Sequence, residues 1–427
     1  MARPQHKQYD VVIIGGGMVG SSLACALQKL LVKSASKILL LESLPIKYER
    51  ALQPGFDVRS TVLSFGTVHY LQSLGLWDEL KSSAEPIREI HVSDQGRFGK
   101  ANITTRDTGV DALGYVLENQ AIGLVLNKRL LAAGTKGKGE IEATQIETLS
   151  PARVSGITHH NGSAILECQQ QDEQFTVETD LLVMAEGGRS GLCEKLGIHR
   201  TQHVYEQVAV IANVAFSKSH GNIAYERFTP KGPLALLPLP DFDECHRAAL
   251  IWTQNAHDYQ NVMNLSDADF LAGLQAEFGQ RLGSFTKVGE RAAFPLSLQT
   301  AEEQIRHNLV LLGNVAHTLH PVAGQGFNLA FRDLMRLASN IAQSITGGQS
   351  PGKYSRLQEY LQETEMDQQK TIDFSHYLTR FFSSNKQAVM WFRKFGLLSI
   401  DLLPPLKNTL ARQAMGLGDR MLETIEP

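Results

Sequence analysis

Three glycines near the start of the chain have a spacing that suits the binding of a phosphate group. Gly15, Gly17 and Gly20 form G-x-G-x-x-G directly after four apolar residues, 11–14, that predict a short buried strand. A helical pattern follows over about 18–32. The first glycine allows the tight turn, the second lets the backbone approach a pyrophosphate, and the third lets the helix pack on the strand. The helix N-terminus then stabilises the phosphate charge.

An acidic residue stands where the ribose of a dinucleotide would lie. A second apolar strand, 37–41, ends directly before Glu42. An acid about twenty positions past such glycines suits a ribose hydroxyl. Strand, glycines, helix, strand and terminal acid, in this order, predict a dinucleotide-binding fold. The alternative is a glycine-rich turn that binds no ligand.

A second loop with binding potential follows the apolar strand 181–185. The strand ends in Glu186-Gly187-Gly188. Ligands of doubly wound sheets bind at the carboxyl ends of the strands, where such loops lie. The loop is therefore either part of a binding site or a plain turn after a core strand.

A third glycine-rich loop lies between the strand 309–312 and a helix. Gly313-Asn314 follows the strand, and Gly324-Gln325-Gly326 begins the helix. A helix start of this kind presents backbone N–H groups to an anion or a polarised ring. The predicted buried face of the helix carries Leu334, Leu337, Ala338 and Ile341.

His317 and His320 lie within this third loop and raise the question of a metal ion. No further histidine or cysteine follows at ligand spacing, so we expect no metal. The cysteines form no C-x-x-C pair, so neither a zinc site nor a disulfide framework is predicted, and a reducing compartment fits. They are Cys25, Cys168, Cys193 and Cys245.

The overall composition excludes some classes of function. The chain has 427 residues, with 41 Lys and Arg against 44 Asp and Glu, a net charge of −3. This near-balance argues against nucleic acid as the main partner. The polar N-terminus has no signal-peptide core, and no stretch approaches the ~18 apolar residues of a membrane span. We expect a soluble or peripheral protein, located in the cytoplasm.

The middle and the end of the chain follow different patterns. Residues 208–254 contain successive strands without helices between them, which predicts an antiparallel sheet that could wall off an apolar pocket. From Lys353 onward the pattern is helical. Its aromatic stripe, which begins at Phe374 and continues past Trp391, is either core or a surface for a membrane, a lipid tail or a partner.

Three separated motifs together resemble one family. They are GGGMVG at 15–20, AEGGRS at 185–190 and GNVAHTLHPVAGQGFNL at 313–329. They resemble the FAD-dependent aromatic hydroxylases of the para-hydroxybenzoate hydroxylase type. Within that group the chain is similar to the ubiquinone-biosynthesis hydroxylases, through GFDVRSTVLS, HVSDQGRFG, YEQVAVIANV and ERFTPKGPLALLPL. The resemblance covers the chain up to about Gly347.

The resemblance implies an FAD site and its residues. By position in the motifs, the pyrophosphate would be held by Gly15, Gly17 and Gly20, and the adenosine ribose by Glu42. Arg59 would lie near the flavin, Glu186 and Gly187 would contact FAD and NAD(P)H, and the ribityl chain would be bound by Gly313 and Asn314. The isoalloxazine would be lined by Pro321, Gly324, Gln325, Gly326 and Asn328.

Some positions depart from the family pattern. Glu186 and Asn314 stand where relatives usually have aspartate. The Glu186 side chain is longer by one methylene group, and Asn314 lacks the negative charge. An asparagine oxygen can still accept a hydrogen bond from a ribityl hydroxyl. Leu124 and Val125 stand where relatives carry an arginine or glutamine, which puts one FAD contact in doubt.

The resemblance also implies an α/β fold with three parts. A Rossmann-like FAD-binding domain would comprise 1–80, 107–195 and 290–350. An inserted antiparallel substrate domain would comprise 81–106 and 196–289, and a helical C-terminal region would follow over 351–427.

The activity implied by the resemblance is a monooxygenation. NAD(P)H would reduce FAD, and O2 would then form a C4a-hydroperoxyflavin that hydroxylates the ring of a polyprenylated methoxyphenol, of the 2-octaprenyl-6-methoxyphenol type, to a hydroquinol. A base for the phenol is not identified, with His320 and Pro321 as weak candidates for a catalytic role. A substrate with such a tail implies peripheral contact with the inner membrane or with other ubiquinone-biosynthesis proteins.

Three other interpretations stay open. One is a flavin hydroxylase of a soluble aromatic compound, which the apolar strands of the middle region disfavour. Another is a plain NAD-dependent dehydrogenase, which leaves the third loop unexplained. The last is a non-catalytic scaffold within a biosynthetic complex.

Overall fold

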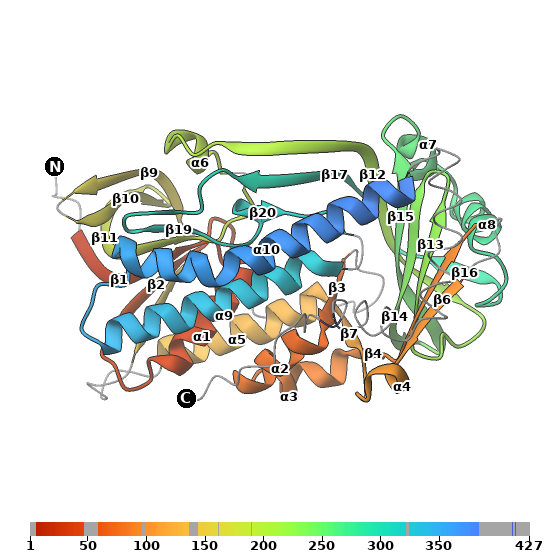
Figure 1. Cartoon of the computed structure of the whole chain (residues 1–427), viewed down its shortest axis with the longest axis horizontal. Helices are drawn as coiled ribbons and strands as arrows, with labels where there is room; N and C mark the ends of the chain where they lie inside the picture. Colours follow the sequence, from red (N-terminus) through yellow and green to blue (C-terminus); the bar gives the residue numbers. More distant parts are fainter. Residues whose placement is uncertain are drawn as a thin grey trace.

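The computed structural model describes residues 6–46, 59–95, 100–135, 144–160, 162–188, 190–321 and 324–383, together with Arg412 and Met415. Its described part is a mixed α/β structure, with a largely parallel sheet at one end and an antiparallel sheet at the other (Figure 1). The predicted fold class is therefore confirmed.

The first sheet has eight strands among the described residues, and its centre is parallel. Its order is β18–β19–β11–β1–β2–β8, with β9 and β10 added antiparallel beside β11. The predicted strands are confirmed, and β1 begins earlier than its apolar run. The strands are β1 (His6–Ile14), β2 (Lys37–Leu41), β8 (Gln145–Leu149), β9 (Arg153–His160), β10 (Ser163–Gln170), β11 (Glu173–Met184), β18 (Ile305–Arg306) and β19 (Leu309–Leu311).

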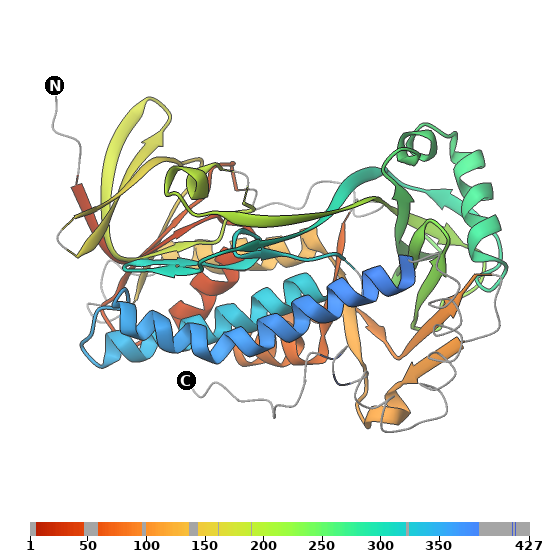
Figure 2. The ribbon, with the colours of Figure 1, turned by 45° about the horizontal axis from the view of Figure 1, so that its top comes forward.

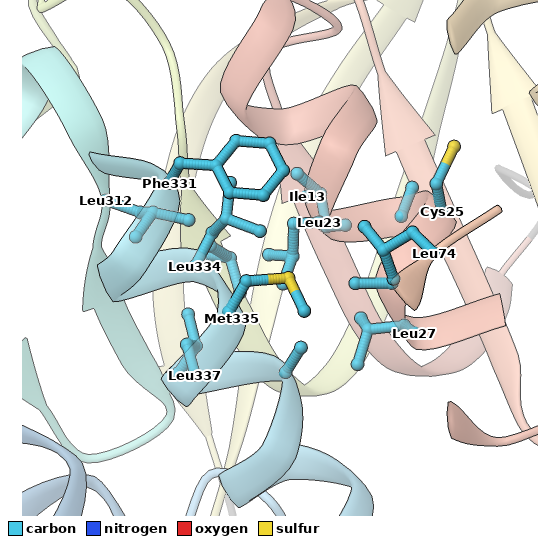
Figure 3. Packing of buried hydrophobic residues seen from close by; sticks show 14 of the residues in the cluster. Ile13, Leu23, Cys25, Leu27, Leu74, Leu312, Phe331, Leu334, Met335 and Leu337 are labelled. Carbon is cyan, nitrogen blue, oxygen red and sulfur yellow. The ribbon is translucent and has the colours of Figure 1, made fainter. Parts of the chain in front are cut away.

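Helices cover one face of this sheet (Figure 1). Leu23 and Leu27 of α1 pack against Leu334 and Leu337 of α9 in a fully buried cluster (Figure 3). Burial of this apolar face holds the helices on the sheet, at about 25 cal/mol per Å² of apolar surface. The helices are α1 (Met18–Leu30), α5 (Asn119–Thr135), α9 (Gln325–Thr346) and α10 (Tyr354–Ser383); the opposite face carries α6 (Leu192–Lys195).

A three-stranded sheet lies between the two larger ones. Its order is β3–β7–β4, and all its pairs are antiparallel. The strands are β3 (Ser60–Ser64), β4 (Glu85–Ile87) and β7 (Gly114–Glu118), and the adjoining helices are α2 (Phe65–Ser73), α3 (Trp77–Leu80), η1 (Lys81–Ser83) and α4 (Thr105–Thr108).

The second large sheet has nine strands among the described residues. Its order is β20–β17–β12–β15–β14–β13–β5–β6, with β16 beside β12. The predicted antiparallel sheet over 208–254 is confirmed, and only the β13–β5 pair is parallel. The strands are β5 (Glu89–Asp94), β6 (Lys100–Thr104), β12 (Arg200–Phe216), β13 (Ile223–Thr229), β14 (Gly232–Phe242), β15 (Cys245–Asn255), β16 (Phe285–Val288), β17 (Ala292–Ala301) and β20 (His317–Thr318).

Strand alternation divides this sheet into two faces. The outer face packs under α8 (Asp267–Phe278) beside the short helix α7 (Tyr259–Met263). We call the opposite face, which carries Ala224, Leu237 and Ala249, the inner face. It packs against Val62 and Phe65 of the three-stranded sheet region, so it faces the rest of the molecule.

The long strands β12 and β17 connect the two ends of the molecule (Figure 2). They pair from Arg200 opposite Ala301 to Ile211 opposite Ala292. β17 therefore belongs to the nine-stranded sheet, although the sequence assigns 290–350 to the FAD-binding part. The domain boundaries stay a proposal, and we propose to count β17 with the substrate sheet.

The C-terminal region is helical where the structure describes it. α10 packs along α9, and the aromatic stripe begins on it with a half-buried Phe374 and with Tyr377, which is 65% exposed. The stripe beyond residue 383 lies outside the described residues. Met415 is buried in the inner-face cluster, and its carbonyl oxygen accepts the Gly66 N–H at 3.1 Å. No helix in the described part is long and apolar enough to cross a membrane.

Candidate functional site

The turn between β1 and α1 closes tightly on the second predicted loop. Gly15 has a φ of +107°, and its N–H donates to the Leu41 carbonyl oxygen at 2.8 Å. A Cβ at Gly15 would lie 2.8 Å from the Ala185 carbonyl oxygen, and one at Gly20 would lie 1.9 Å from the Gly15 oxygen. Both positions therefore require glycine for backbone packing.

Gly17 has a different environment from its two neighbours in the motif. It is exposed, it is the N-cap of α1, and a Cβ placed on it would have nothing within 4 Å. The space beside the first turn of the helix is therefore open. Unpaired N–H groups of a helix N-terminus in open space suit a phosphate.

Glu42 lies at the edge of this open space. Its Oε2 accepts the Gly16 N–H at 2.7 Å, and its Oε1 accepts the Leu44 N–H at 2.8 Å. These bonds fix the carboxylate beside the glycine turn. A carboxylate has further acceptor capacity on both oxygens, so a ribose hydroxyl can still donate to it.

The second and third loops meet the first at the ends of neighbouring strands. The Ala185 N–H donates to the Ile14 carbonyl oxygen at 2.8 Å, and the Leu312 N–H donates to the Met184 oxygen at 2.9 Å. A Cβ at Gly313 would lie 3.3 Å from Val19 of α1. All three loops are therefore gathered around the start of α1.

Within the second loop, Glu186 turns back onto its own backbone. Its Oε2 accepts the Ser190 N–H at 3.1 Å, while Gly187 beside it is exposed. A Cβ at Gly188 would lie 3.5 Å from the Asn314 carbonyl oxygen, so the second and third loops are in contact. The Asn314 residue itself is exposed.

The start of α9 is bonded to β3. Gly324 has a φ of +60°, and a Cβ there would lie 3.0 Å from Val62. The Asn328 amide donates to the Val62 oxygen at 2.8 Å and to the Gly324 oxygen at 2.7 Å, and its own oxygen accepts the Ser64 N–H at 2.8 Å. Asn328 thus shapes the loop through protein contacts.

Neighbouring residues of this loop differ in exposure. Pro321 is exposed, Gln325 is buried, and Gly326 is half-buried with no atom within 4 Å of a Cβ placed on it.

Arg59 is exposed beside the inner face, where its guanidinium carbon lies 5.9 Å from the Phe294 ring centre.

His320 is a buried residue of the third loop. It is 1% exposed, and its ring meets the Tyr205 ring edge-on at 5.2 Å between centres. Burial lowers the pKa of His320 to about 4. The imidazole is therefore neutral at pH 7, and it is a weak proton acceptor.

A family model described as an FAD binding domain matches residues 8–375. The chain belongs to this family. Ubiquinone hydroxylase UbiL of Rhodospirillum rubrum is 33% identical over 412 residues, which cover 96% of this chain and 90% of the relative. The human mitochondrial ubiquinone biosynthesis monooxygenase COQ6 is 30% identical over 437 residues, covering 94% and 91%. These findings confirm the predicted family and the enzyme class, a flavin-dependent monooxygenase.

Solved structures agree with the fold of this FAD-binding family. The p-nitrophenol 4-monooxygenase PnpA from Pseudomonas putida superposes with a TM-score of 0.73 over 98% of this chain and 100% of that chain, at 16% identity. The anhydrotetracycline hydroxylase OxyS from Streptomyces rimosus gives 0.69 over 96% and 76%, at 20% identity. At these identities the likeness concerns the fold alone.

The residues present fit FAD. The open space at Gly17 provides room for a pyrophosphate, and Glu42 is fixed beside it. Gly187 and Asn314 are exposed, and a Cβ at Gly187 or Gly326 would have nothing within 4 Å. The assignment of each residue to a part of FAD stays a prediction.

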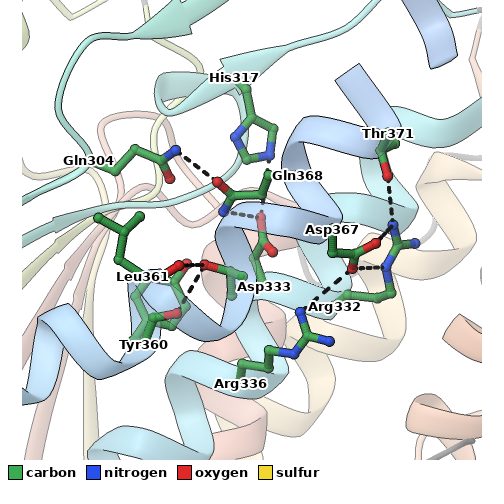
Figure 4. A network of polar contacts seen from close by, with 11 residues as sticks. Gln304, His317, Arg332, Asp333, Arg336, Tyr360, Leu361, Asp367, Gln368 and Thr371 are labelled. Atoms are coloured by element: carbon green, nitrogen blue, oxygen red, sulfur yellow. Dashed lines mark hydrogen bonds and ion pairs between the residues drawn. The ribbon is translucent and has the colours of Figure 1, made fainter. Parts of the chain in front are cut away.

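A buried polar network behind the third loop escaped the sequence analysis (Figure 4). Asp333 of α9 is fully buried, and its Oδ2 lies 3.4 Å from His317 Nε2 and accepts from Gln368 of α10 at 3.0 Å. Gln304 in turn donates to Gln368 at 2.8 Å. The one available signal was an aspartate within the apolar face of a predicted helix. No group of three potential metal ligands occurs among the described residues.

Proposed function

We propose that this protein hydroxylates the aromatic ring of a polyprenylated methoxyphenol in ubiquinone biosynthesis, using FAD, NAD(P)H and O2. One observation carries the proposal: the start of α9, where the third glycine loop ends, lies against Val62, and Val62 packs against the apolar inner face. The names of the relatives, a ubiquinone hydroxylase and a ubiquinone biosynthesis monooxygenase, support the pathway.

The inner face favours an oily aromatic substrate. Ala224, Leu237 and Ala249 are apolar, and they pack near Val62 and Phe65 beside the loop that begins at Gly324. Such a surface binds an apolar ring and excludes water. A carboxylated soluble substrate would instead need a cationic side chain on this face as its partner, and Arg247 there is already paired with Glu118 at 3.3 Å, so the prenylated phenol fits better.

FAD, when bound, supplies the two-electron and oxygen chemistry of the reaction. The chain supplies position and dryness. The first loop and Glu42 hold the adenine end, and the third loop with the start of α9 lines the reactive end. Asn328 holds the loop and β3 at a fixed separation through its four hydrogen bonds to Val62, Gly324, Ser64 and Thr67.

Substrates of this kind reside in a membrane, so we propose peripheral membrane contact, on the cytoplasmic side, or delivery by other biosynthetic proteins. Truncation after Asp373 removes the aromatic stripe and tests its role. The same truncation removes Met415, which is buried against the inner face. The truncated protein is therefore assayed with both a long-tailed and a short-tailed phenol. Loss of turnover on the long-tailed phenol alone supports a docking role.

Two measurements test the proposal. A deletion strain is expected to accumulate the polyprenylated methoxyphenol, and the purified yellow protein is expected to oxidise NAD(P)H faster when that phenol is added. A protein that stays colourless after FAD is offered contradicts the proposal. A scaffold role is favoured instead if the strain accumulates several precursors and a variant unable to bind FAD restores ubiquinone.

A further inference from the structure

One carboxylate lies on the inner face of the substrate sheet. Along β13, Ala224 belongs to the inner cluster and Tyr225 to the outer one, where its ring lies 5.3 Å from that of Phe278. Because side chains alternate along a strand, Glu226 lies on the inner face and Arg227 on the outer face. Nothing in the local sequence distinguishes Glu226 from a surface glutamate.

The strands on both sides give Glu226 apolar neighbours. Ala235 of β14 and Val92 of β5 stand directly opposite it in the sheet. Among the described residues, no group hydrogen-bonds or ion-pairs with the Glu226 carboxylate. A charged group without a partner in apolar surroundings is costly, so its position calls for a ligand that supplies the partner.

Other charged groups on the inner face lie further away. Asp94 of β5 pairs with Phe228, which places it diagonal to Glu226 across this parallel pair of strands. Ala235, which stands opposite Glu226, is in register with Ile251 of β15. Arg247 of the same strand lies two inner-face positions away from Ile251. Its guanidinium is already paired with Glu118 at 3.3 Å.

Glu226 is half-buried. Desolvation raises the pKa of Glu226 to about 7. At neutral pH the side chain therefore exchanges between the carboxylate and the acid at low cost. A proton acceptor is most effective when its pKa lies close to the working pH.

Part of the candidate FAD site packs close to the inner face. Val62 packs in the inner-face cluster, and Gly324 at the start of α9 lies against Val62. A ring bound beside Val62 would have one edge toward the sheet and the other toward the loop at Gly324. Glu226 approaches it from the sheet.

We propose that Glu226 accepts the proton of the substrate's phenolic hydroxyl and thereby activates the ring for hydroxylation at the para carbon. The inference rests on the proposed function. The O–H bond breaks, the proton goes to a Glu226 oxygen, and the electron pair stays on the phenol oxygen, from which it enriches the ortho and para carbons. The para carbon then lies at the opposite edge of the ring, toward the flavin side.

The balance of the reaction is complete with the reactants already named. One atom of O2 forms the new C–O bond and the other leaves as water, with NAD(P)H and a proton as the reductant pair. The hydrogen displaced from the ring carbon leaves as a proton when aromaticity returns. The phenol oxygen takes up a proton as aromaticity returns, so that the product is a para-hydroquinol. Glu226 releases its proton to solvent before the next cycle.

The test compares Glu226→Gln with a matched control, Glu89→Gln, which makes the same change on β5 of the same sheet but on the outer face. A short-tailed prenylated methoxyphenol serves as the soluble probe. Product formed per NAD(P)H consumed is measured across neutral pH, together with ring-position analysis of the product. Infrared difference spectra of the FAD-loaded proteins follow the carboxylic acid band without any turnover.

In the wild-type protein we expect an acid band that disappears with a midpoint near pH 7, and hydroxylation that rises over the same range. Glu226→Gln is expected to lose that band, to keep FAD, and to lose about 100-fold or more of its hydroxylation. Glu89→Gln is expected to match the wild type. Should Glu226→Gln lose FAD, acetate rescue of Glu226→Ala provides the second measurement, and restored product formation supports the inference.

Two results overturn the inference while leaving the proposed function intact. One is a Glu226→Gln variant that hydroxylates at the wild-type rate with the same pH profile. The other is a catechol as the wild-type product, since the new oxygen would then be ortho to the hydroxyl. A wild-type protein that binds FAD but never hydroxylates the phenol contradicts the proposed function itself.

Discussion

Asn328 on α9 donates its amide to the Val62 carbonyl oxygen of β3 at 2.8 Å, and this bond joins two segments separated by 266 positions. The amide also donates to Gly324 at 2.7 Å. Replacing Asn328 with aspartate keeps the shape and removes both donors. Two half-buried carbonyl oxygens then lose their partner and face a carboxylate.

We expect Asn328→Asp to lower the free energy of unfolding by about 1–3 kcal/mol and to weaken FAD binding. Urea denaturation of the apoprotein and titration with FAD measure the two effects separately. Asn255→Asp, at an exposed position, is the control. Unchanged stability and affinity in Asn328→Asp would show that the loop keeps its shape without these bonds.

The glycine motif allows a sharper distinction, between a position needed by the fold and one needed by the ligand. Gly20→Ala places a Cβ 1.9 Å from the Gly15 oxygen, whereas Gly17→Ala meets no protein atom within 4 Å. We expect Gly20→Ala to destabilise the apoprotein. Gly17→Ala is expected to unfold like the wild type but to bind FAD at least tenfold more weakly.

Thermal unfolding of the apoproteins and FAD titration by flavin fluorescence check this pair. Gly123→Ala in α5, which also has open space around it, is the control and is expected to gain about 0.5–1 kcal/mol without a change in FAD affinity. Normal FAD binding by Gly17→Ala would show that the pyrophosphate does not bind at this turn.

Sequence reasoning succeeded here where the signal is local. The turn at Gly15 and the helix start at Gly324 are each encoded by a few adjacent residues, and both elements form as predicted. The role of Asn328 depends on Val62 and Ser64, which lie more than 260 positions away. The environment of Glu226 depends on strand register, which no local pattern encodes.

The buried His320 predicts a pH effect on stability. Burial lowers its pKa to about 4. Between about pH 6.5 and pH 4 the unfolded chain therefore binds a proton at His320 that the folded protein does not bind. Stability from this group is therefore complete above pH 6.5 and is lost progressively as the pH falls toward 4. The loss amounts to about 3 kcal/mol over that interval.

His320→Asn removes this titration. We expect its free energy of unfolding, measured by urea denaturation at a series of pH values, to fall less steeply than that of the wild type between about pH 6.5 and pH 4. The difference between the two curves isolates His320 from the other titrating groups. Parallel curves would mean that the folded protein protonates His320 as readily as the unfolded chain does.

Asp333 connects α9, α10 and the third loop through one buried carboxylate. Its Oδ2 lies 3.4 Å from His317 Nε2 and accepts from Gln368 at 3.0 Å, with the carboxylate and imidazole side chains only 1% and 2% exposed. Removing the Asp333 carboxylate leaves the buried Gln368 amide without its acceptor, which costs about 1–3 kcal/mol. We therefore expect Asp333→Ala to be strongly destabilised. Because His317 follows Asn314 by three positions, FAD affinity is expected to fall as well.

Asp333→Asn, which keeps the shape and one acceptor oxygen, is expected to lose less stability than Asp333→Ala. Glu365→Ala, at an exposed position of α10, is the control and is expected to change stability by no more than about 0.5 kcal/mol. Urea denaturation and FAD titration of the three variants give the comparison. If Asp333→Ala unfolds within about 0.5 kcal/mol of the wild type, the network does not hold the loop, and packing alone positions His317.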